Sequence, residues 1–444
     1  MSHIAIVITG LTGKLHASFE MASRLKASGH NVTYMCPANV RKKVEEQGFV
    51  YIQLPEIHFH FKNPVYRKPG SNSWIKKFIY RLKHASKIYT EVKSILRLSD
   101  FEERIRSVNP DKMLIDMELH EIILAASSVG IPFKLYSSWF SHKKHVQLPP
   151  IRTNIVPGEG WQGTFLGIAL AQCKEHIKVN AKLLYSSLTL NNYRRKTLMQ
   201  YAEDSGFSTK DMAASNFPPL FIYTRTPILT MAMEEMEFPN ASLKNLTYIG
   251  PMVFNNREVH PEDTVRIKRL EQIFTTGKSS HKKFIYCSLG TLIESDVRFV
   301  QKVVDAVSTN PDWVLLVSFG GKQGMDELTI NTGNVHIFQW VPQLYLLSKV
   351  DCSINHGGMH TVNECIHFKV PMLIYSGKKF DQNGCAARVS YHGMGIMGDK
   401  DKDDHKTIHR NIDKVLNQPT YKEKMVYMNG VYNHYRQIDI STYL

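Results

Sequence analysis

The stretch that decides the fold covers residues 338–382 and reads FQWVPQLYLLSKVDCSINHGGMHTVNECIHFKVPMLIYSGKKFDQ. Its centre predicts a buried strand at 351–354 and a helix from Met359 onward. Between them, Gly357 and Gly358 let the backbone come close to a ligand. The free N–H groups and the dipole of the first helical turn attract phosphate. This unit therefore predicts an α/β domain with an anion site at the carboxyl edge of its sheet.

Polar side chains surround this turn in a pattern that suits a nucleotide with an anionic leaving group. His356 and His360 offer N–H donors, and Thr361 adds a hydroxyl. Glu364 lies one turn after His360 on the same helical face, where a carboxylate suits the two hydroxyls of a ribose. The pair Thr361 and Glu364 also matches a capping box, an arrangement that needs no ligand.

Two further groups of side chains flank the turn. Trp340 has an aromatic face of the kind that stacks on a nucleobase, and Gln343 follows it within reach of a ribose. Asp381 and Gln382 follow a second predicted strand, 371–375, and can receive sugar hydroxyls. Because neighbouring parallel strands present ligands at one carboxyl edge, we expect all these groups in one site.

The pattern W-x-x-Q, H-x-G, [ST]-x-x-E, V-P and D-Q resembles the donor-binding signature of the family 1 UDP-glycosyltransferases. This resemblance implies the GT-B fold, an α/β architecture in which two Rossmann-like, doubly wound domains face a central cleft. It implies uracil against Trp340, ribose on Gln343 and Glu364, diphosphate on His356 and Thr361, and the sugar on Asp381 and Gln382. The donor-binding set that it implies is Ser288, Gly290, Thr291, Trp340, Val341, Gln343, His356, Gly358, His360, Thr361, Glu364, Asp381 and Gln382.

Two positions in that set need comment. The family usually has asparagine where this chain has His360. Ser288-Leu289-Gly290-Thr291 resembles the family's S-x-G-[ST] turn, whose hydroxyl faces the phosphates. The same four residues also fit an ordinary turn from a strand to a helix.

The resemblance and the local composition together divide the chain. Residues 1–237 are expected to form an acceptor-binding Rossmann-like domain, which starts with a β-α-β pattern. Residues 238–261 contain several prolines and little periodicity, and they predict a linker. Residues 262–420 are expected to form the donor-binding domain. Residues 421–444 are expected to carry a helix that crosses back to the first domain.

Composition limits the partners. The 55 Lys and Arg residues exceed the 40 Asp and Glu residues, for a net charge of +15, which favours anionic partners. No nucleic-acid-binding motif accompanies this charge, so we expect no nucleic acid. The six cysteines form no C-x-x-C pair and predict free thiols in a reducing compartment. Without a leader-like N-terminus or a long apolar segment, the chain resembles the soluble members, and we expect a cytoplasmic protein.

Residues 62–97 form a basic stretch. It holds ten Lys or Arg residues against one acidic residue, Glu91, and its apolar residues recur at near-helical spacing. One interpretation is a basic amphipathic surface that touches a membrane or a lipid-like acceptor. The other is a solvated helix whose opposite face packs on the sheet.

Sugar transfer to a hydroxyl needs a base, and a histidine backed by a carboxylate is the natural choice. Asp116 ends a predicted strand at the position where the family has this carboxylate. The family's histidine falls on Lys14, and His16 comes two residues later. We favour His16 as the base, in a shifted loop. The alternatives are a different site built on Lys14, or no base at all, because a lysine of ordinary pKa is protonated at pH 7.

These observations predict an inverting glycosyltransferase. It moves a sugar, by resemblance glucose, from a UDP-sugar to a hydroxyl of a small lipophilic acceptor, with His16 and Asp116 as catalytic residues. Neither a metal nor another cofactor is expected, because a helix N-terminus and His356 can stabilise the charge on UDP. A UDP-sugar epimerase or a lipid glycosyltransferase is the enzymatic alternative. A non-catalytic or atypical nucleotide-sugar binder is the other alternative, because of Lys14.

Overall fold

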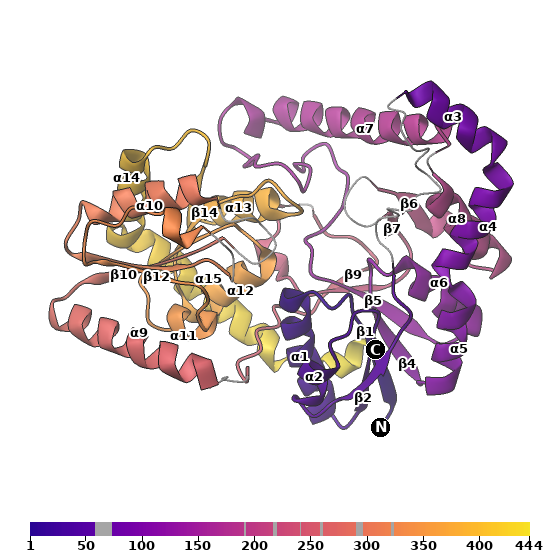
Figure 1. The fold of residues 1–444 in the computed structure, drawn as a ribbon, viewed down its shortest axis with the longest axis horizontal. Helices are drawn as coiled ribbons and strands as arrows, with labels where there is room; N and C mark the ends of the chain where they lie inside the picture. Colours follow the sequence, from indigo (N-terminus) through magenta and orange to yellow (C-terminus); the bar gives the residue numbers. More distant parts are fainter. Residues whose placement is uncertain are drawn as a thin grey trace.

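The computed structural model describes residues 1–57, 73–190, 192–215, 220–239, 241–257, 261–289, 296–320 and 324–444. Two parallel β-sheets, each covered by helices on both faces, lie side by side along the long axis (Figure 1). This arrangement confirms the predicted α/β class with two Rossmann-like domains. Gly290 and Thr291 of the predicted donor set, and residues 62–72 of the basic stretch, lie outside the described residues.

The first sheet has seven strands in the order β3-β2-β1-β4-β5-β8-β9, and all neighbouring pairs are parallel. The chain moves outward from β1 to β3 and then returns to place β4 beside β1. A reversal of this kind leaves a crevice at the carboxyl ends of the two strands. The strands are β1 (His3–Val7), β2 (Asn31–Cys36), β3 (Val50–Gln53), β4 (Lys112–Asp116), β5 (Phe133–Ser137), β8 (Ile228–Thr230) and β9 (Leu246–Tyr248).

Helices cover both faces of this sheet because successive strand residues point to opposite sides. Ile4 and Ile6 of β1 pack in a core with α1 (Thr12–Ala27) and α2 (Arg41–Glu45). Ala5 and Val7 face the opposite core. The helices on that side are α4 (Ala85–Leu96), α5 (Leu98–Val108), α6 (His120–Val129) and α8 (Tyr193–Asp204).

Two helices, α7 (Phe165–Leu188) and α3 (Trp74–Lys83), lie at the outer edge of this domain. The long helix α7 follows the short turn η2 (Trp161–Gly163), and Figure 1 shows it along the top of the molecule. The helix α3 lies near its C-terminal end. A small antiparallel pair, β6 (Met212–Ala214) with β7 (Phe221–Tyr223), completes the domain.

The second sheet has six parallel strands in the order β12-β11-β10-β13-β14-β15, so its reversal lies between β10 and β13. Its strands are β10 (Lys283–Ser288), β11 (Trp313–Ser318), β12 (Val335–Phe338), β13 (Cys352–Asn355), β14 (Met372–Tyr375) and β15 (Gly395–Gly398). One face packs on α10 (Val297–Ser308) and α14 (His405–Asn417). The other packs on α9 (Pro261–Ser279), α11 (Gln343–Leu347), α12 (Met359–Phe368) and α13 (Gln382–Tyr391).

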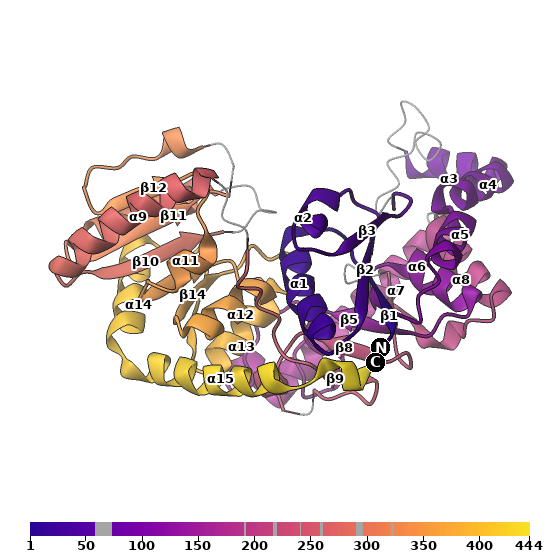
Figure 2. The ribbon, with the colours of Figure 1, turned by 90° about the horizontal axis from the view of Figure 1, so that it is seen from below.

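The last helix, α15 (Pro419–Gln437), runs beneath both domains and returns to the first (Figure 2). Arg24 of α1 fixes its end, because Nη2 donates to the carbonyl of Tyr435 at 3.0 Å. Gly250 allows the close approach there, since a Cβ on it would lie 2.3 Å from the Cβ of Tyr435. The final turn η6 (Ile440–Tyr443) places Ile440 in the core of the first domain.

A buried ion pair also joins the two domains. Arg388 of α13 donates through Nε and Nη2 to Glu237 Oε2, at 3.1 and 2.6 Å. Both side chains are almost fully buried. The guanidinium also lies over the rings of Phe140 and Phe238, with centroids 4.2 and 4.5 Å away. These contacts fix α13 against the first domain next to the cleft.

Candidate donor and acceptor site

The glycine turn between β13 and α12 has the backbone geometry that phosphate binding at a helix N-terminus requires. Asn355 Oδ1 accepts a hydrogen bond from the N–H of Gly357 at 2.9 Å. Gly357 has a φ of 78°, and a Cβ on it would lie 2.7 Å from Ile374, so this position needs glycine. Gly358 is the N-cap of α12, and no side chain caps the helix there.

The capping-box interpretation of Thr361 and Glu364 is wrong. The helix begins at Met359, so Thr361 is already its third residue and cannot be the N-cap. The carboxylate of Glu364 instead contacts Gln343 and Arg257. Glu364 is therefore directed sideways from the helix, toward α11 and the linker.

Gln343 and Glu364, the two predicted ribose ligands, are in direct contact. Gln343 Nε2 donates to Glu364 Oε2, and the hydroxyl of Tyr286 donates to Gln343 Oε1 at 3.3 Å. Arg257 Nη2 forms an ion pair with the other oxygen of Glu364. Arg257 carries no signal in the sequence, because it lies in an irregular segment, 251–257, more than 100 residues before its partner.

Trp340, three residues before Gln343, has 39% of its surface exposed. The next residue, Val341, is buried in the core, so the loop turns the indole outward. The guanidinium of Arg266, in α9, lies 5.7 Å from the ring centroid. An exposed indole face of this kind suits stacking on a nucleobase.

The two histidines lie at the start of α12, where it meets the first domain. The ring of His360 lies against α1, since a Cβ on Gly13 would be 3.2 Å from its Cδ2. Burial lowers the pKa of His360 to about 4, and the charges of Lys14 and Arg257 act in the same direction. The imidazole is therefore neutral at pH 7. The ring of His356 folds over the turn, with its Nε2 2.7 Å from where a Cβ on Gly358 would lie.

The remaining described residues of the donor set lie at the same sheet edge. Ser288 ends β10 and is the register partner of Asn355 in β13. Asp381 and Gln382 begin α13, after β14. Burial raises the pKa of Asp381 to about 6, and its Oδ2 accepts from the thiol of Cys385 at 3.3 Å. Gln382 Oε1 accepts from the N–H of residue 377 at 2.9 Å, which holds its own loop.

Across the cleft, the first domain presents a cluster of three buried charges. Lys14 Nζ lies 2.9 Å from Asp116 Oδ2 and 2.6 Å from Glu118 Oε1. Trp139 Nε1 donates to the same Glu118 oxygen at 3.0 Å. The ring of Trp139 lies 6.2 Å from that of Phe380, which precedes Asp381 in the second domain. The cluster therefore borders the predicted sugar position.

Charge and burial oppose each other in this cluster. Burial lowers the pKa of Lys14, but the charges of Asp116 and Glu118 outweigh it, so this pKa lies above its usual value. Lys14 is therefore a permanent cation. Burial raises the pKa of Asp116 to about 6, although Lys14 beside it favours the carboxylate form. Glu118 was missed from sequence, although a second carboxylate two residues beyond the end of a strand is a recognisable signal.

The predicted loop around His16 is instead helical. α1 begins at Thr12, so Lys14 and His16 lie about 200° apart around the helix axis. Lys14 faces Asp116. His16 points the other way from the helix, where the charges of Arg257, Lys43 and His360 act on it. Burial, with these charges acting in the same direction, lowers the pKa of His16 to about 3. The contact that we expected between His16 and Asp116 is made by Lys14, and the role of His16 as base stays a prediction.

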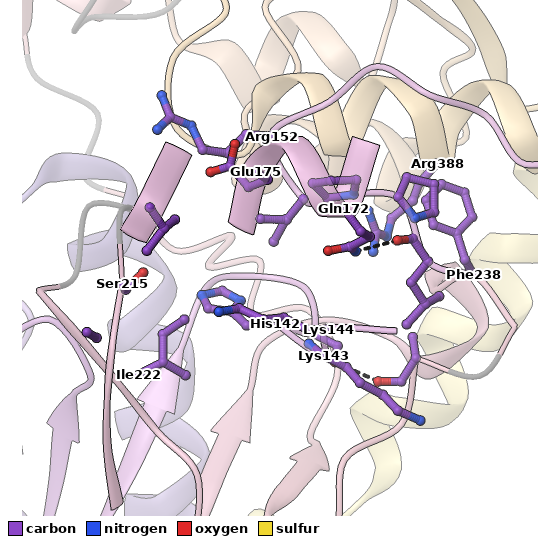
Figure 3. Close-up of a pocket in the computed structure, with 18 residues that line it drawn as sticks. His142, Lys143, Lys144, Arg152, Gln172, Glu175, Ser215, Ile222, Phe238 and Arg388 are labelled. Carbon is purple, nitrogen blue, oxygen red and sulfur yellow. Dashed lines mark hydrogen bonds between the residues drawn. The ribbon is translucent and has the colours of Figure 1, made fainter. Parts of the chain in front are cut away.

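A largely apolar pocket adjoins this cluster (Figure 3). It encloses about 740 Å³ of empty space, part of it open to solvent. Figure 3 shows Arg388 and Phe238 at one end and Ser215 and Ile222 at the other. His142, which lines it, lies 6.5 Å from the ring of Trp139. The pocket therefore lies next to the charged cluster, on the acceptor side of the cleft.

Three features of the described residues bear on the other expectations. No three His, Cys, Asp or Glu side chains there gather as metal ligands would. Among the helices that the structure describes, none has the length and apolar character of a membrane span. All six cysteines are free thiols. The expectations of a metal-free reaction and of a cytoplasmic protein stay predictions.

Comparison with curated proteins finds glycosyltransferases. A zeaxanthin glucosyltransferase of Pantoea ananas is 22% identical over 434 residues, which cover 96% of this chain and 91% of that protein. YdhE of Bacillus subtilis (strain 168), an uncharacterised UDP-glucosyltransferase, is 34% identical over 155 residues, covering 35% of this chain and 39% of that protein.

Solved structures show the same fold. The glycosyltransferase of kitacinnamycin superposes with a TM-score of 0.64 at 20% identity, over 98% of this chain and 96% of that one. Glycosyltransferase VinC, solved in complex with dTDP, gives a TM-score of 0.62 at 16% identity, over 97% and 95% of the two chains. The predicted GT-B fold is confirmed.

The family described as UDP-glucoronosyl and UDP-glucosyl transferase matches residues 212–437. That segment is just over half of the chain and includes every strand of the second sheet. Because it also contains Trp340, His356 and Glu364 at the sheet edge, this chain belongs to the UDP-glucoronosyl and UDP-glucosyl transferase family and is a glycosyltransferase that uses a UDP-sugar.

Proposed function

We propose that the protein transfers a sugar, glucose in the first instance, from a UDP-sugar to a hydroxyl of a small lipophilic acceptor, with inversion at the anomeric carbon. One observation carries this proposal. The donor-type residues at the edge of the second sheet meet the charged cluster of the first domain, through His360 against Gly13 and Phe380 against Trp139. A sugar held at Asp381 would therefore face the acceptor side.

The pocket supports a lipophilic acceptor. Its walls include Leu148, Ile151, Val179 and Ile222, and apolar walls of this kind are typical of small-molecule sites. The relative that aligns over almost the whole chain is named for zeaxanthin, an apolar acceptor. Both facts favour an acceptor with a large apolar body.

The proposed reaction is a single displacement. The acceptor oxygen forms a bond to the anomeric carbon as the bond from that carbon to UDP breaks. The electron pair of the broken bond leaves with the diphosphate, where the N-terminus of α12 and His356 stabilise the charge. The proton of the acceptor hydroxyl passes to a base of the first domain.

His16 and Glu118 are two candidates for this base, and they differ in chemistry. His16 is neutral, as a base must be, but its pKa of about 3 makes it a weak one. Glu118 is a carboxylate held by Lys14 and Trp139 beside the predicted sugar. His16→Ala and Glu118→Gln separate them. The variant that loses turnover while UDP affinity is kept identifies the base.

A donor-by-acceptor screen tests the whole proposal. UDP-glucose and other UDP-sugars are incubated with a panel of phenols and apolar alcohols, and products are detected by mass spectrometry. We expect a glycoside and one equivalent of UDP, with opposite anomeric configuration by NMR coupling constants. Retention of configuration would refute inversion. Tight UDP-sugar binding without UDP release on any acceptor would refute the transferase and favour a binder.

A further inference from the structure

Half of the exposed large apolar side chains lie on one part of the first domain. Of the 22 such side chains in the described part of the chain, eleven belong to α3, η2 and α7. On α7 they form a stripe of Leu166, Leu170, Ile177, Leu184 and Leu188, each 49–63% exposed. Their spacings are combinations of three and four residues, so they share one helix face. An exposed apolar face of this length marks an interaction surface.

The neighbouring helix α3 continues this surface. Ile75, Ile79 and Leu82 are 45–59% exposed and also lie at helical spacing. Arg81 of α3 donates to the carbonyl of Thr189, directly after the end of α7, at 2.8 Å. The two helices therefore form one outer edge, which Figure 1 shows along the top of the domain.

Most of the exposed charges beside this edge are positive. Lys174, Lys178 and Lys182 are exposed and recur one turn apart along α7. The single acidic residue of α7, Glu175, lines the pocket instead, and α3 has no acidic residue. A second copy of the chain would bring the same lysine row to the contact, and the exposed Glu159 beside η2 is too few to balance three lysines on each copy. An anionic lipid surface supplies the opposite charge together with an apolar layer.

We propose that the α3–α7 edge docks on a membrane surface that contains anionic lipid. Helices with exposed Leu, Ile, Trp and Phe beside a row of lysines have the composition of segments that lie in the bilayer interface. Trp161 and Phe165, 63% and 61% exposed at the start of α7, suit the headgroup region.

This docking gives the acceptor pocket a route to lipid. Gln172 and Val179 line the pocket from α7, so the helix that would rest on the bilayer is also a wall of the pocket. Docking would therefore place the pocket one helix away from acceptors dissolved in the membrane. This second step rests on the proposed function, whereas docking itself does not.

Vesicle flotation of the full chain tests docking without any catalytic assay. Vesicles of phosphatidylcholine are compared with vesicles that also contain phosphatidylglycerol. We expect binding to the anionic vesicles, weakened when salt rises from about 0.05 to about 0.5 M. Leu170→Gln, Ile177→Gln and Leu184→Gln combined should weaken binding by about tenfold or more, because binding scales with the apolar area inserted.

A matched control uses exposed apolar residues of the second domain. Val265→Gln, Ile330→Gln and Val426→Gln combined remove similar side chains that are 40–70% exposed, and binding should stay at the wild-type level. Thermal unfolding and UDP binding should be unchanged in both triple variants. Equal loss in the control, or no binding of the wild type at low salt, would overturn the proposal. A dimer that only the α7 variant dissociates, without vesicle binding, would make the edge a contact between copies.

Discussion

Replacing Lys14 with methionine is the sharpest test of the charged cluster. Methionine keeps most of the length and apolar volume of the lysine stem but removes the ammonium group. Lys14 Nζ lies 3.2 and 2.9 Å from the two oxygens of Asp116 and 2.6 Å from Glu118. All three side chains are at most 14% exposed. The substitution therefore leaves two carboxylates buried beside each other without a cation.

The size of the expected loss of stability follows from the burial of these three side chains. Removing one partner of a buried ion pair typically costs about 3–5 kcal/mol, because the remaining charge is left uncompensated. Native domains are stable by roughly 5–15 kcal/mol, so the loss is large. We expect Lys14→Met to lower the free energy of unfolding at pH 8 by about 3–5 kcal/mol.

The loss of stability in Lys14→Met should be larger at high pH than at low pH. In the folded protein the pKa of Asp116 is already raised to about 6, from 3.8, so the folded state holds its proton to a higher pH than the unfolded chain. Without Lys14 this pKa rises further. The carboxylate then takes up a proton as the pH falls, and protonation removes the uncompensated charge. The difference from wild type should therefore shrink between pH 8 and pH 5.

Denaturant unfolding at pH 8, 7, 6 and 5 measures this difference. Lys42→Met is the matched control, because Lys42 is 85% exposed and lies 3.7 Å from Glu46 in a surface pair. Such a pair contributes about 0–1 kcal/mol, and the control should show no pH trend. If Lys14→Met lost less than the control, or lost more at pH 5 than at pH 8, the buried ion-pair reasoning would be wrong.

Substitutions at three further positions test other parts of the site and of the domain interface. Arg388→Met leaves Glu237 buried without its cation and should lower the free energy of unfolding by about 3–5 kcal/mol, with Arg388→Lys losing less. Trp340→Ala should weaken UDP binding by about 1–3 kcal/mol in calorimetry, and uridine should lose as much, because stacking involves the base alone. Glu364→Ala should weaken UDP binding by about 1.5–3 kcal/mol. An unchanged affinity for UDP would exclude Glu364 as a ribose ligand.

The fold and most of the donor edge could be predicted because their signals are local. Buried strands read as short apolar runs, and the glycines after β13 mark a turn that only glycine can make at Gly357. The family pattern then supplied the order of the donor residues. The structure brings Gln343, His360 and Glu364 to one edge because each follows a parallel strand of the same sheet.

The acceptor-side chemistry could not be predicted in the same way. α1 starts at Thr12 after Leu11, which offers no side-chain cap, so nothing in the sequence signals a helix that early. The helix then separates Lys14 from His16 by orientation, although they are close in sequence. Asp116, which pairs with Lys14, and Arg257, which pairs with Glu364, each lie more than 100 residues from their partner, and no local pattern specifies such pairs.

The distance between Lys14 and the donor edge depends on the contacts that hold the two domains together. The charge of Lys14 acts to lower the pKa of both Asp381 and His360. The cluster and the donor edge therefore interact electrostatically. The distance between the cluster and the donor edge is set by two contacts that join the domains: α15 returns to Arg24, and Arg388 is buried against Glu237 beside the cleft. A change at either contact that shifts the domains would therefore alter the charge around the sugar without replacing a residue of the charged cluster or of the donor edge. For this reason Arg388→Lys, which keeps the charge but loses the planar fork, should lower kcat more than it lowers UDP affinity.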